Sequence, residues 1–275
     1  MKTAPQEKVI ITPCRTRSRL QQSLEELGVS YIRSGSTRFD HVELRAKYRS
    51  DSIAARHQRN IESIVSLALD RSERVTSISE PDPDWLELFL TLAEKTSNPR
   101  MQELWARVLL IETRQPSSFS IRTLRVLAEL SAYETSILKR AKSFTALDRK
   151  SGRHKILVGY QQRPGLLRLL KPSQVQINLG RCGLSYPDLL ALMELGIIHQ
   201  DLIETGLLER NQALQLSWSG TKAHLIPLAN ELIVTYFKYT GIGEELCRLI
   251  ITQPNQEYLA ELEQAFSAKY LLQYE

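Results

Sequence analysis

The chain has 275 residues, of which 42% are hydrophobic and 24% are charged, a composition that excludes fibrous and intrinsically disordered proteins. This length gives one large or two smaller domains, each with enough chain for a core. No apolar run approaches the length of a membrane span, and the N-terminal apolar stretch is too short for a signal peptide, so we expect a cytoplasmic protein without membrane contact.

The formal net charge of +5 is distributed unevenly along the chain. Residues 1–60 carry 12 Lys and Arg against 6 Asp and Glu, residues 61–174 carry 18 against 13, and residues 175–275 carry 6 against 12. The first two-thirds therefore favour an acidic partner or nucleic acid, whereas the last third argues against phosphate binding. Attraction between the two ends is the alternative explanation.

Two helices are predicted before residue 70. The first covers 17–28, where three leucines share one face and Gly28 is placed as a C-terminal stop. Residues 29–40 show no period and are typical of a loop. The second helix runs from Val42 to about Leu69 and has an amphipathic pattern. Its basic flank consists of Arg45, Lys47, Arg49, Arg56 and Arg59.

The next two helices begin beside prolines. Asp82 or Asp84 can cap the first, and Asn98 caps the second, where a proline occupies the first helical position. Trp85 and Trp105 lie on the apolar faces of these helices. We therefore predict that both tryptophans belong to the core.

The segment QPSSFS at 115–120 interrupts the helical pattern. Its proline cannot continue a helix, and Ser118 or Ser120 can cap the next one, which predicts a joint between two helices. A catalytic serine would need a nearby base and usually a strained elbow, and the sequence offers neither. Ser131 with Glu134 forms a capping box for one more helix. Three closely linked helices in about 50 residues favour an antiparallel bundle or stacked hairpins.

After Lys155 the sequence predicts short strands, a helix ended by Gly196, a small antiparallel sheet and two closing helices. This order is typical of a winged-helix module, although many small α+β domains share it. The predicted fold class is therefore mainly α, with a helical bundle followed by a small, winged-helix-like α+β domain. The three predicted regions are an N-terminal segment with one short helix at 1–40, the bundle at 41–150 and the α+β domain at 151–275.

Motifs for catalysis are absent from the sequence. No phosphate-binding loop, dinucleotide fingerprint, zinc-protease motif or calcium loop is present. The cysteines form no CxxC pair and are expected to be buried thiols, and no histidine lies within four residues of another His or a Cys. We therefore expect no enzyme, no cofactor and no metal site. The residues concerned are Cys14, Cys182, Cys247, His41, His57, His154, His199 and His224.

The strongest signal for an interaction is the segment 139–155, which we call the basic cluster. Seven basic residues stand there against Asp148 alone. One interpretation is a contact with an anion or nucleic acid. The other is a solvated linker, in which some of the charge stabilises a helix C-terminus. The candidate contacts are Lys139, Arg140, Lys142, Arg149, Lys150, Arg153 and Lys155.

Residues 82–130 resemble a bacterial family of conserved proteins, domain-of-unknown-function family 2806. The shared pattern contains Asp-Trp, a Met-Gln-x-Leu-Trp helix, a Glu and Pro-x-Ser-Phe-Ser, and the flanking HQRNIESIVSLAL and YTGIGEEL also fit it. Ser117 stands where this pattern often has Gly. The resemblance brings no established activity, cofactor or site residue. Residues 101–138 are more loosely similar to proteins associated with abortive phage infection.

Two classes of function follow. The first is a helical interaction or regulatory protein, in the setting of phage defence if the looser resemblance holds, which acts through its surfaces on an unknown protein partner. The alternative is a nucleic-acid-binding protein that uses the basic flank of the long helix and the basic cluster. Association of the chain with itself is compatible with both.

Overall fold

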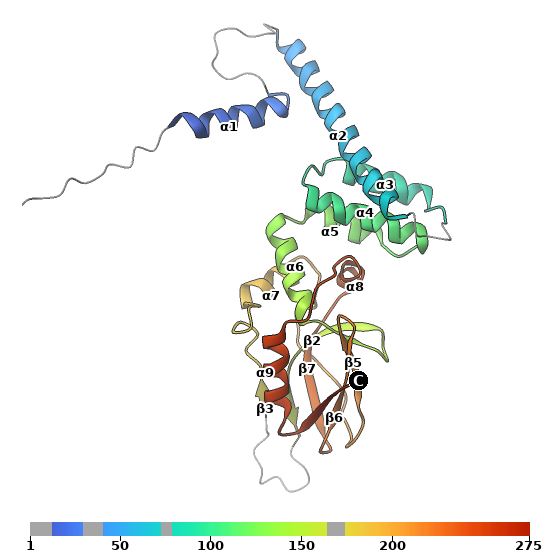
Figure 1. Ribbon diagram of the computed structural model, residues 1–275, viewed down its shortest axis with the longest axis vertical. Coiled ribbons are helices and arrows are strands. Elements are labelled where there is room, and N and C mark those ends of the chain that lie inside the picture. Colours follow the sequence, from blue (N-terminus) through green and yellow to red (C-terminus); the bar gives the residue numbers. More distant parts are fainter. Residues whose placement is uncertain (1–12, 30–40, 73–78, 164–173) are drawn as a thin grey trace, which may run out of the picture.

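The computed structural model describes residues 13–29, 41–72, 79–163 and 174–275. About half of these residues are helical and about one fifth lie in strands. A helical half packs at one end of a second half that is built on an eight-stranded antiparallel sheet (Figure 1). The prediction of a mainly α chain ending in a small winged-helix-like domain is therefore wrong.

The helical half has the helices that the capping signals predict. Asp82 accepts a hydrogen bond from the Trp85 amide, Asn98 accepts one from the Arg100 amide, and Ser131 and Glu134 form the expected capping box. Gly28 follows the first helix with a φ of 73°. The helices are α1 (Pro13–Glu26), α2 (Val42–Ser72), α3 (Pro83–Ala93), α4 (Pro99–Arg114), α5 (Ile121–Glu129) and α6 (Ala132–Phe144). The loop predicted at 29–40 lies almost entirely outside the described residues.

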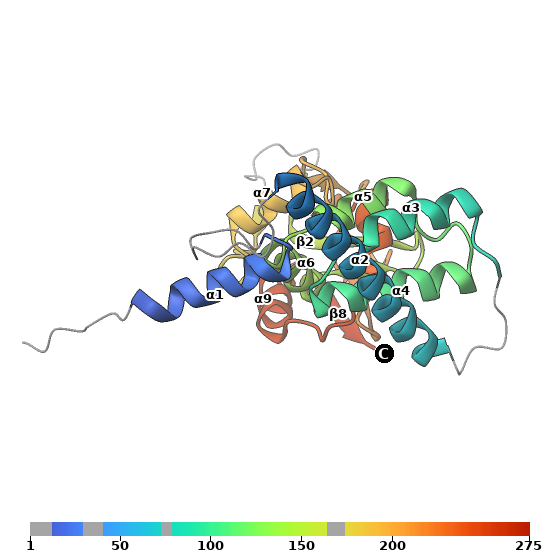
Figure 2. The ribbon, with the colours of Figure 1, turned by 90° about the horizontal axis from the view of Figure 1, so that it is seen from above.

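The core of the helical half is aromatic. The Trp85 and Phe89 rings stack with centroids 5.3 Å apart, and Phe89 meets Trp105 edge to face at 5.4 Å. Trp105 is fully buried and Trp85 nearly so, which confirms the prediction that both are core residues. The Asn60 side-chain amide donates to the Glu94 carbonyl at 2.7 Å and so fixes α2 against the end of α3. Seen from above, α2 lies across α4 (Figure 2).

The first half of α2, residues 42–59, extends beyond this core, and we call it the arm (Figure 1). The first buried residue of α2 is Asn60, so the arm adds no buried residue to the helical core, and only its end meets α3, where His57 Nδ1 lies 3.1 Å from a Glu94 carboxylate oxygen. Val42 is 61% exposed and Leu44 47% exposed. The end of α1 lies against the arm, because a Cβ at Gly28 would come within 2.8 Å of the Arg49 Cα.

The sheet joins strands that are far apart in the sequence. β2 pairs with β7 along most of its length, from Lys155 opposite Lys238 to Gln162 opposite Leu232. The strand order is β4-β7-β2-β1-β5-β6-β8, with β3 pairing β2. The strands are β1 (Ala146–Asp148), β2 (Arg153–Gln162), β3 (Gln174–Gln176), β4 (Ile203–Glu204), β5 (Leu214–Trp218), β6 (Thr221–Pro227), β7 (Leu232–Lys238) and β8 (Tyr270–Tyr274).

Three of these strands, β1, β4 and β8, were not predicted, and they turn a small sheet into a large one. β1 forms an antiparallel hairpin with β2, and the predicted boundary between residues 150 and 151 lies in the turn of this hairpin. β1 also pairs with β5, so it connects two parts of the sheet that sequence patterns treat as separate. A winged-helix arrangement has no place for these pairings.

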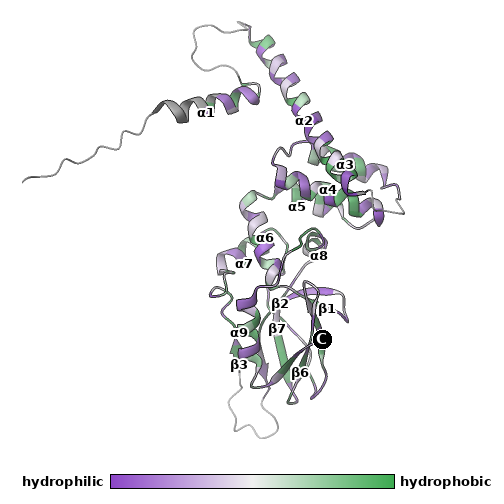
Figure 3. Ribbon diagram, viewed as in Figure 1, coloured by the Kyte–Doolittle hydropathy of each residue, from purple (hydrophilic) through white to green (hydrophobic). Residues whose placement is uncertain are grey.

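Helices cover the sheet at one face and one end. They are α7 (Tyr186–Glu194), α8 (Gly241–Cys247) and α9 (Gln256–Phe266). α9 packs on β2 and β3, and its Tyr258 hydroxyl donates to the Leu157 carbonyl at 2.9 Å. Hydrophobic residues follow β2, β7 and the inner side of α9, whereas α2 alternates between hydrophilic and hydrophobic residues (Figure 3).

Candidate functional site

The joint at 115–120 closes around a buried carboxylate. Glu112, which is 2% exposed, accepts backbone hydrogen bonds from Ser117 at 2.6 Å and from Ser118 and Phe119 at 3.0 Å. Hydrogen bonds to a charged group are stronger than those between neutral groups. Ser117 has a φ of 65°, in the left-handed region that glycine adopts most easily.

The same joint connects the helical half to the sheet half. The Ser120 amide and hydroxyl both donate to the Glu245 carboxylate, at 2.7 and 3.1 Å, and Arg248 donates to the Ser118 carbonyl at 3.3 Å. The Trp85 indole donates to the Phe119 carbonyl at 2.8 Å. We call this set the junction. Its members are Trp85, Glu112, residues 117–120, Glu245 and Arg248.

The serines of the junction have structural contacts. Ser120 is the N-cap of α5, as one of the two predicted alternatives had it, and accepts a hydrogen bond from the Thr123 amide at 3.3 Å. The Ser118 hydroxyl donates to the Gln115 carbonyl. These contacts confirm the prediction of a helix joint at this segment.

Replacing Ser120 with Ala should lower the free energy of unfolding by about 1 kcal/mol, because the α5 cap and one hydrogen bond to Glu245 are lost. Urea unfolding measures this change. Ser136→Ala is the matched control, since Ser136 is exposed within α6 and its hydroxyl donates to the Tyr133 carbonyl of the same helix. A loss of binding without a loss of stability in Ser120→Ala would show that the serine has a functional role.

A second polar group holds α8 to the sheet. Glu244 is 7% exposed and accepts a hydrogen bond from the His154 amide at 2.7 Å, while its other oxygen lies 2.5 Å from His154 Nδ1. Thr240 caps α8 by accepting from the Gly243 amide. A Cβ at Gly243 would overlap the Ile197 carbonyl oxygen, so the glycine permits this close approach. The YTGIGEEL segment therefore anchors α8.

The described cysteines are unsuited to nucleophilic chemistry. Cys182 and Cys247 are buried and free, as predicted, while the side chain of Cys14 lies outside the described residues. Burial raises the pKa of the Cys247 thiol to about 12. Burial, followed by the charges of Glu257 and Glu261, also raises the pKa of Cys182. Both are neutral thiols near pH 7, and the thiolate is the reactive form.

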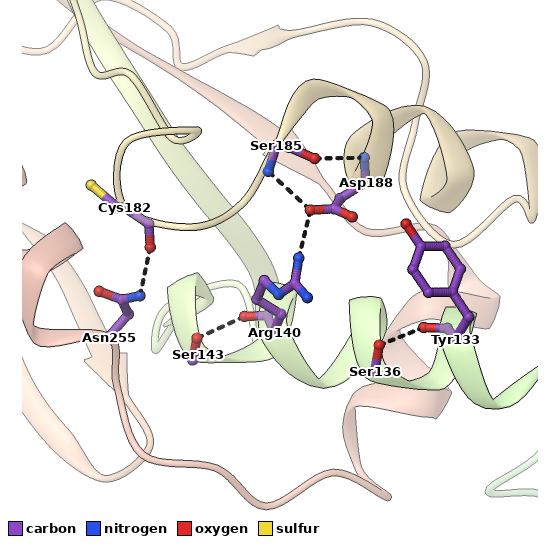
Figure 4. Close-up of polar contacts among 8 residues, drawn as sticks. All are labelled: Tyr133, Ser136, Arg140, Ser143, Cys182, Ser185, Asp188 and Asn255. Atoms are coloured by element: carbon purple, nitrogen blue, oxygen red, sulfur yellow. Dashed lines mark hydrogen bonds and ion pairs between the residues drawn. The ribbon is translucent and has the colours of Figure 1, made fainter. Parts of the chain in front are cut away.

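The basic cluster is the end of α6 and the β1–β2 hairpin rather than a linker, and three of its seven side chains form ion pairs. Arg140 binds Asp188 at 2.8 Å, beside the α7 capping box (Figure 4). Arg149 binds Glu275, and the buried Lys155 binds Asp148 at 2.7 Å. Burial alone would raise the pKa of Asp148, but the hydrogen bond and charge of Lys155 lower it. These three side chains stabilise the fold.

The other four cluster residues form no ion pair with any described residue. Lys139 is exposed and Lys142 half-buried on α6, whereas Lys150 and Arg153 are exposed at the tip of the hairpin. The structure therefore divides the predicted cluster between two elements. The hairpin tip keeps two cations available to an anion.

A pocket of about 480 Å³ opens between the sheet and α7. Its lining is mainly apolar, with the amides of Gln176 and Asn178 as polar groups, and Tyr186 at its edge is 67% exposed. Within the described residues, the lining contains no Asp, Glu, His, Lys, Arg or Cys side chain. This part of the lining therefore offers mainly apolar contact.

Sequence reasoning missed the two buried carboxylates, Glu112 and Glu244. Glu112 lies in an amphipathic helix where a glutamate is ordinarily exposed, and Glu244 is 90 residues from His154. The available signal was the recurrence of a Glu and of the Pro-x-Ser-Phe-Ser and YTGIGEEL segments in the family pattern. The structure brings these segments together at α8.

Two further kinds of feature are absent from the part of the chain that the structure describes. There, no group of three or more His, Cys, Asp or Glu side chains is arranged to hold a metal ion. No described helix has both the length and the apolar character to cross a membrane.

Comparison with known proteins gives one match. The model of a family described as a protein of unknown function, DUF2806, matches residues 44–263. No curated protein and no solved structure matches the chain. The matched range contains the junction, most of the arm and all strands of the sheet except β8.

Proposed function

The chain belongs to the DUF2806 family of proteins of unknown function, and we propose that it is a non-catalytic binding protein whose arm contacts a partner protein. The exposed arm is the observation that carries this proposal. Leu44 and Tyr48 are exposed and lie one helical turn apart on one face. Arg45 and Lys47 flank this face, and Asp51 continues it by one turn. A contiguous apolar surface bordered by charge is typical of a protein interface.

The charges of the arm indicate the chemistry of the partner. Arg49, Arg56 and Arg59 recur at helical spacing on one side of α2, whereas Glu43 and Asp51 lie away from that side. An apolar surface bordered by acidic groups would complement this arrangement. The junction supports the proposal, because it fixes the helical half to the sheet and so gives the arm a rigid base.

A capture experiment tests the proposal. The tagged full-length protein is purified from cells that express it, after nuclease treatment, as wild type, as Leu44→Glu and as Ile251→Glu. Ile251 is 80% exposed in the loop after α8, so its variant carries the same change outside the arm. We expect a stoichiometric protein partner with the wild type and with Ile251→Glu, and its loss with Leu44→Glu. A partner that all three forms retain, or no partner with any of them, would contradict the proposal.

Nucleic-acid binding is the second candidate, favoured by the unpaired Lys150 and Arg153 at the hairpin tip. If this surface binds duplex nucleic acid, reversing both residues to Glu should weaken binding and reduce the slope of log affinity against log salt, by about 0.9 for each lost phosphate contact. Titrations of duplex DNA and RNA at several salt concentrations measure this.

The control for this titration is Arg210→Glu, which reverses an exposed charge in the acidic last third. Its binding should match that of the wild type. Absence of wild-type binding at low salt eliminates the second candidate, and equal effects of the two variants show that only net charge matters.

The proposed setting in phage defence rests on the looser resemblance of residues 101–138 to abortive-infection proteins. Phage plating efficiency on cells with and without the chain tests it. We expect a reduction that Leu44→Glu abolishes, and plating that does not depend on the chain rejects this setting.

A further inference from the structure

The pocket between the sheet and α7, which we call the α7 pocket, has an apolar floor and a polar mouth. It encloses about 480 Å³, and sites for small molecules span about 300 to 1,000 Å³. Val158, Leu184 and Leu189 on its floor are nearly or fully buried, whereas Gln176 and Tyr186 at its mouth are exposed. Apolar walls with a few polar groups are typical of a site for a small molecule.

The backbone of β2 and β3 shapes one side of the α7 pocket. The pairing of β2 with β7 shifts register between Leu157 and Gly159, and Val158, at this irregularity, lines the pocket. A Cβ at Gly159 would come within 2.1 Å of the Val175 carbonyl oxygen, so the glycine lets β3 approach and brings Gln176 to the pocket. Strand irregularities that redirect a side chain are common beside active sites.

The start of α7 forms another part of the wall. Ser185 and Asp188 make the capping box that begins this helix, and Tyr186 and Leu189 line the pocket from its first turn. Asp188 also binds Arg140 of α6 at 2.8 Å (Figure 4), which fixes α7 against the neighbouring helix. The wall is therefore held in place before a ligand binds, and such preorganisation lowers the free-energy cost of binding.

The side chains of these walls indicate the chemistry of the ligand. The described walls carry no charged side chain, and a charge that leaves water without a counter-charge costs free energy. The Gln176 amide and the Tyr186 hydroxyl can each donate and accept a hydrogen bond. These walls therefore favour an uncharged molecule with an apolar body and a polar end.

We propose that the α7 pocket binds a small uncharged organic molecule, whose apolar rings occupy the floor and whose polar end meets Gln176 and Tyr186 at the mouth. An apolar cavity of about 150 Å³ holds one benzene molecule, so the α7 pocket has room for two or three rings. The pocket belongs to the sheet half, whereas the arm extends from the helical half (Figure 1). This binding site is thus additional to the proposed protein contact.

Fluorescence titration of the full-length protein with two matched probes tests this proposal. Phenylnaphthylamine is uncharged and becomes fluorescent in apolar surroundings, and anilinonaphthalene sulfonate has the same rings with a negative charge. We expect saturable binding of phenylnaphthylamine at one site per chain. Its affinity should exceed that of the sulfonate by about tenfold or more, because the sulfonate would lose hydration without gaining a counter-charge.

Two tryptophan substitutions locate the binding site. Leu202 and Leu207 are each 44% exposed, on either side of β4, and Leu202 lines the pocket. Leu202→Trp narrows the mouth and should weaken phenylnaphthylamine binding by about tenfold or more, since small changes of volume in an apolar pocket have effects of this size. Leu207→Trp is the matched control and should bind as the wild type does. Circular dichroism with thermal unfolding checks that both variants are folded.

Three results would overturn the proposal. The first is the absence of saturable phenylnaphthylamine binding by the wild type. The second is binding that Leu202→Trp leaves unchanged, or that Leu207→Trp weakens equally, because the probe would then lie elsewhere. The third is sulfonate binding as tight as that of the uncharged probe. The capture experiment on the arm does not depend on this titration, so the two proposals can fail separately.

Discussion

Replacing Glu112 with Ala should lower the free energy of unfolding by about 2 to 6 kcal/mol. The substitution leaves three backbone amides without their acceptor, and two of them, those of Ser118 and Phe119, belong to buried residues. A buried donor that loses its partner costs about 1 to 3 kcal/mol. Urea unfolding measures the change, and Glu112→Gln, which keeps one acceptor oxygen, should lose less.

The control for Glu112 is Glu87→Ala, because Glu87 is exposed on α3. Surface substitutions of this kind typically change stability by at most about 0.5 kcal/mol. If Glu112→Ala were as stable as Glu87→Ala, the carboxylate would not hold the junction together. The contacts that Ser120 and Arg248 make between the two halves would then hold the junction together without it.

The second large effect is expected for Trp105→Ala, with a loss of about 3 to 5 kcal/mol. Trp105 is fully buried and packs edge to face on Phe89 at 5.4 Å, so the truncation leaves a cavity in the helical half. Thermal and urea unfolding measure the loss. Trp105→Phe should retain more stability than Trp105→Ala, because it fills part of the space and the indole nitrogen has no hydrogen-bond partner.

Tyr133→Ala is the control for Trp105, since Tyr133 is 66% exposed on α6 and its truncation creates no cavity. Its stability should stay close to that of the wild type. Unchanged stability of Trp105→Ala would mean that the helical half does not depend on this aromatic core.

The helices could be predicted from the sequence because their signals are local. Asp82, Asn98, Ser120 and Ser131 each lie within a few residues of the amides that they cap, and the apolar residues of each helix recur at one spacing. The long helix and its basic flank were predicted for the same reason. The packing between the helices is consistent with these local signals, and the helices could be predicted without knowing it.

The size of the sheet could not be predicted, because its pairings are not local. Lys155 lies opposite Lys238, and nothing in the sequence of either strand specifies the other. β1 has three residues and β4 has two, which is too short for a period to be visible. β8 follows a helix without a turn signal that would mark a new strand. These strands acquire their conformation from the neighbours with which they pair.

The candidate site could be predicted only in part, because the contacts that define it are also not local in the sequence. Sequence spacing identified the basic cluster, but the carboxylates that neutralise Arg140 and Arg149 lie 48 and 126 residues away. Sequence spacing likewise treated Glu112 as one more polar residue of an amphipathic helix. The structure is needed to tell the paired cations Arg140, Arg149 and Lys155 from the exposed cations at the hairpin tip, Lys150 and Arg153.

Site-specific photo-cross-linking in living cells tests most directly the claim that the arm is the binding surface. A photoreactive amino acid replaces Leu44 in the arm or, as the control, Thr91 on the exposed side of α3. We expect a discrete cross-linked product with a second protein from position 44 and none from position 91. No product from position 44, or the same products from both positions, would contradict it.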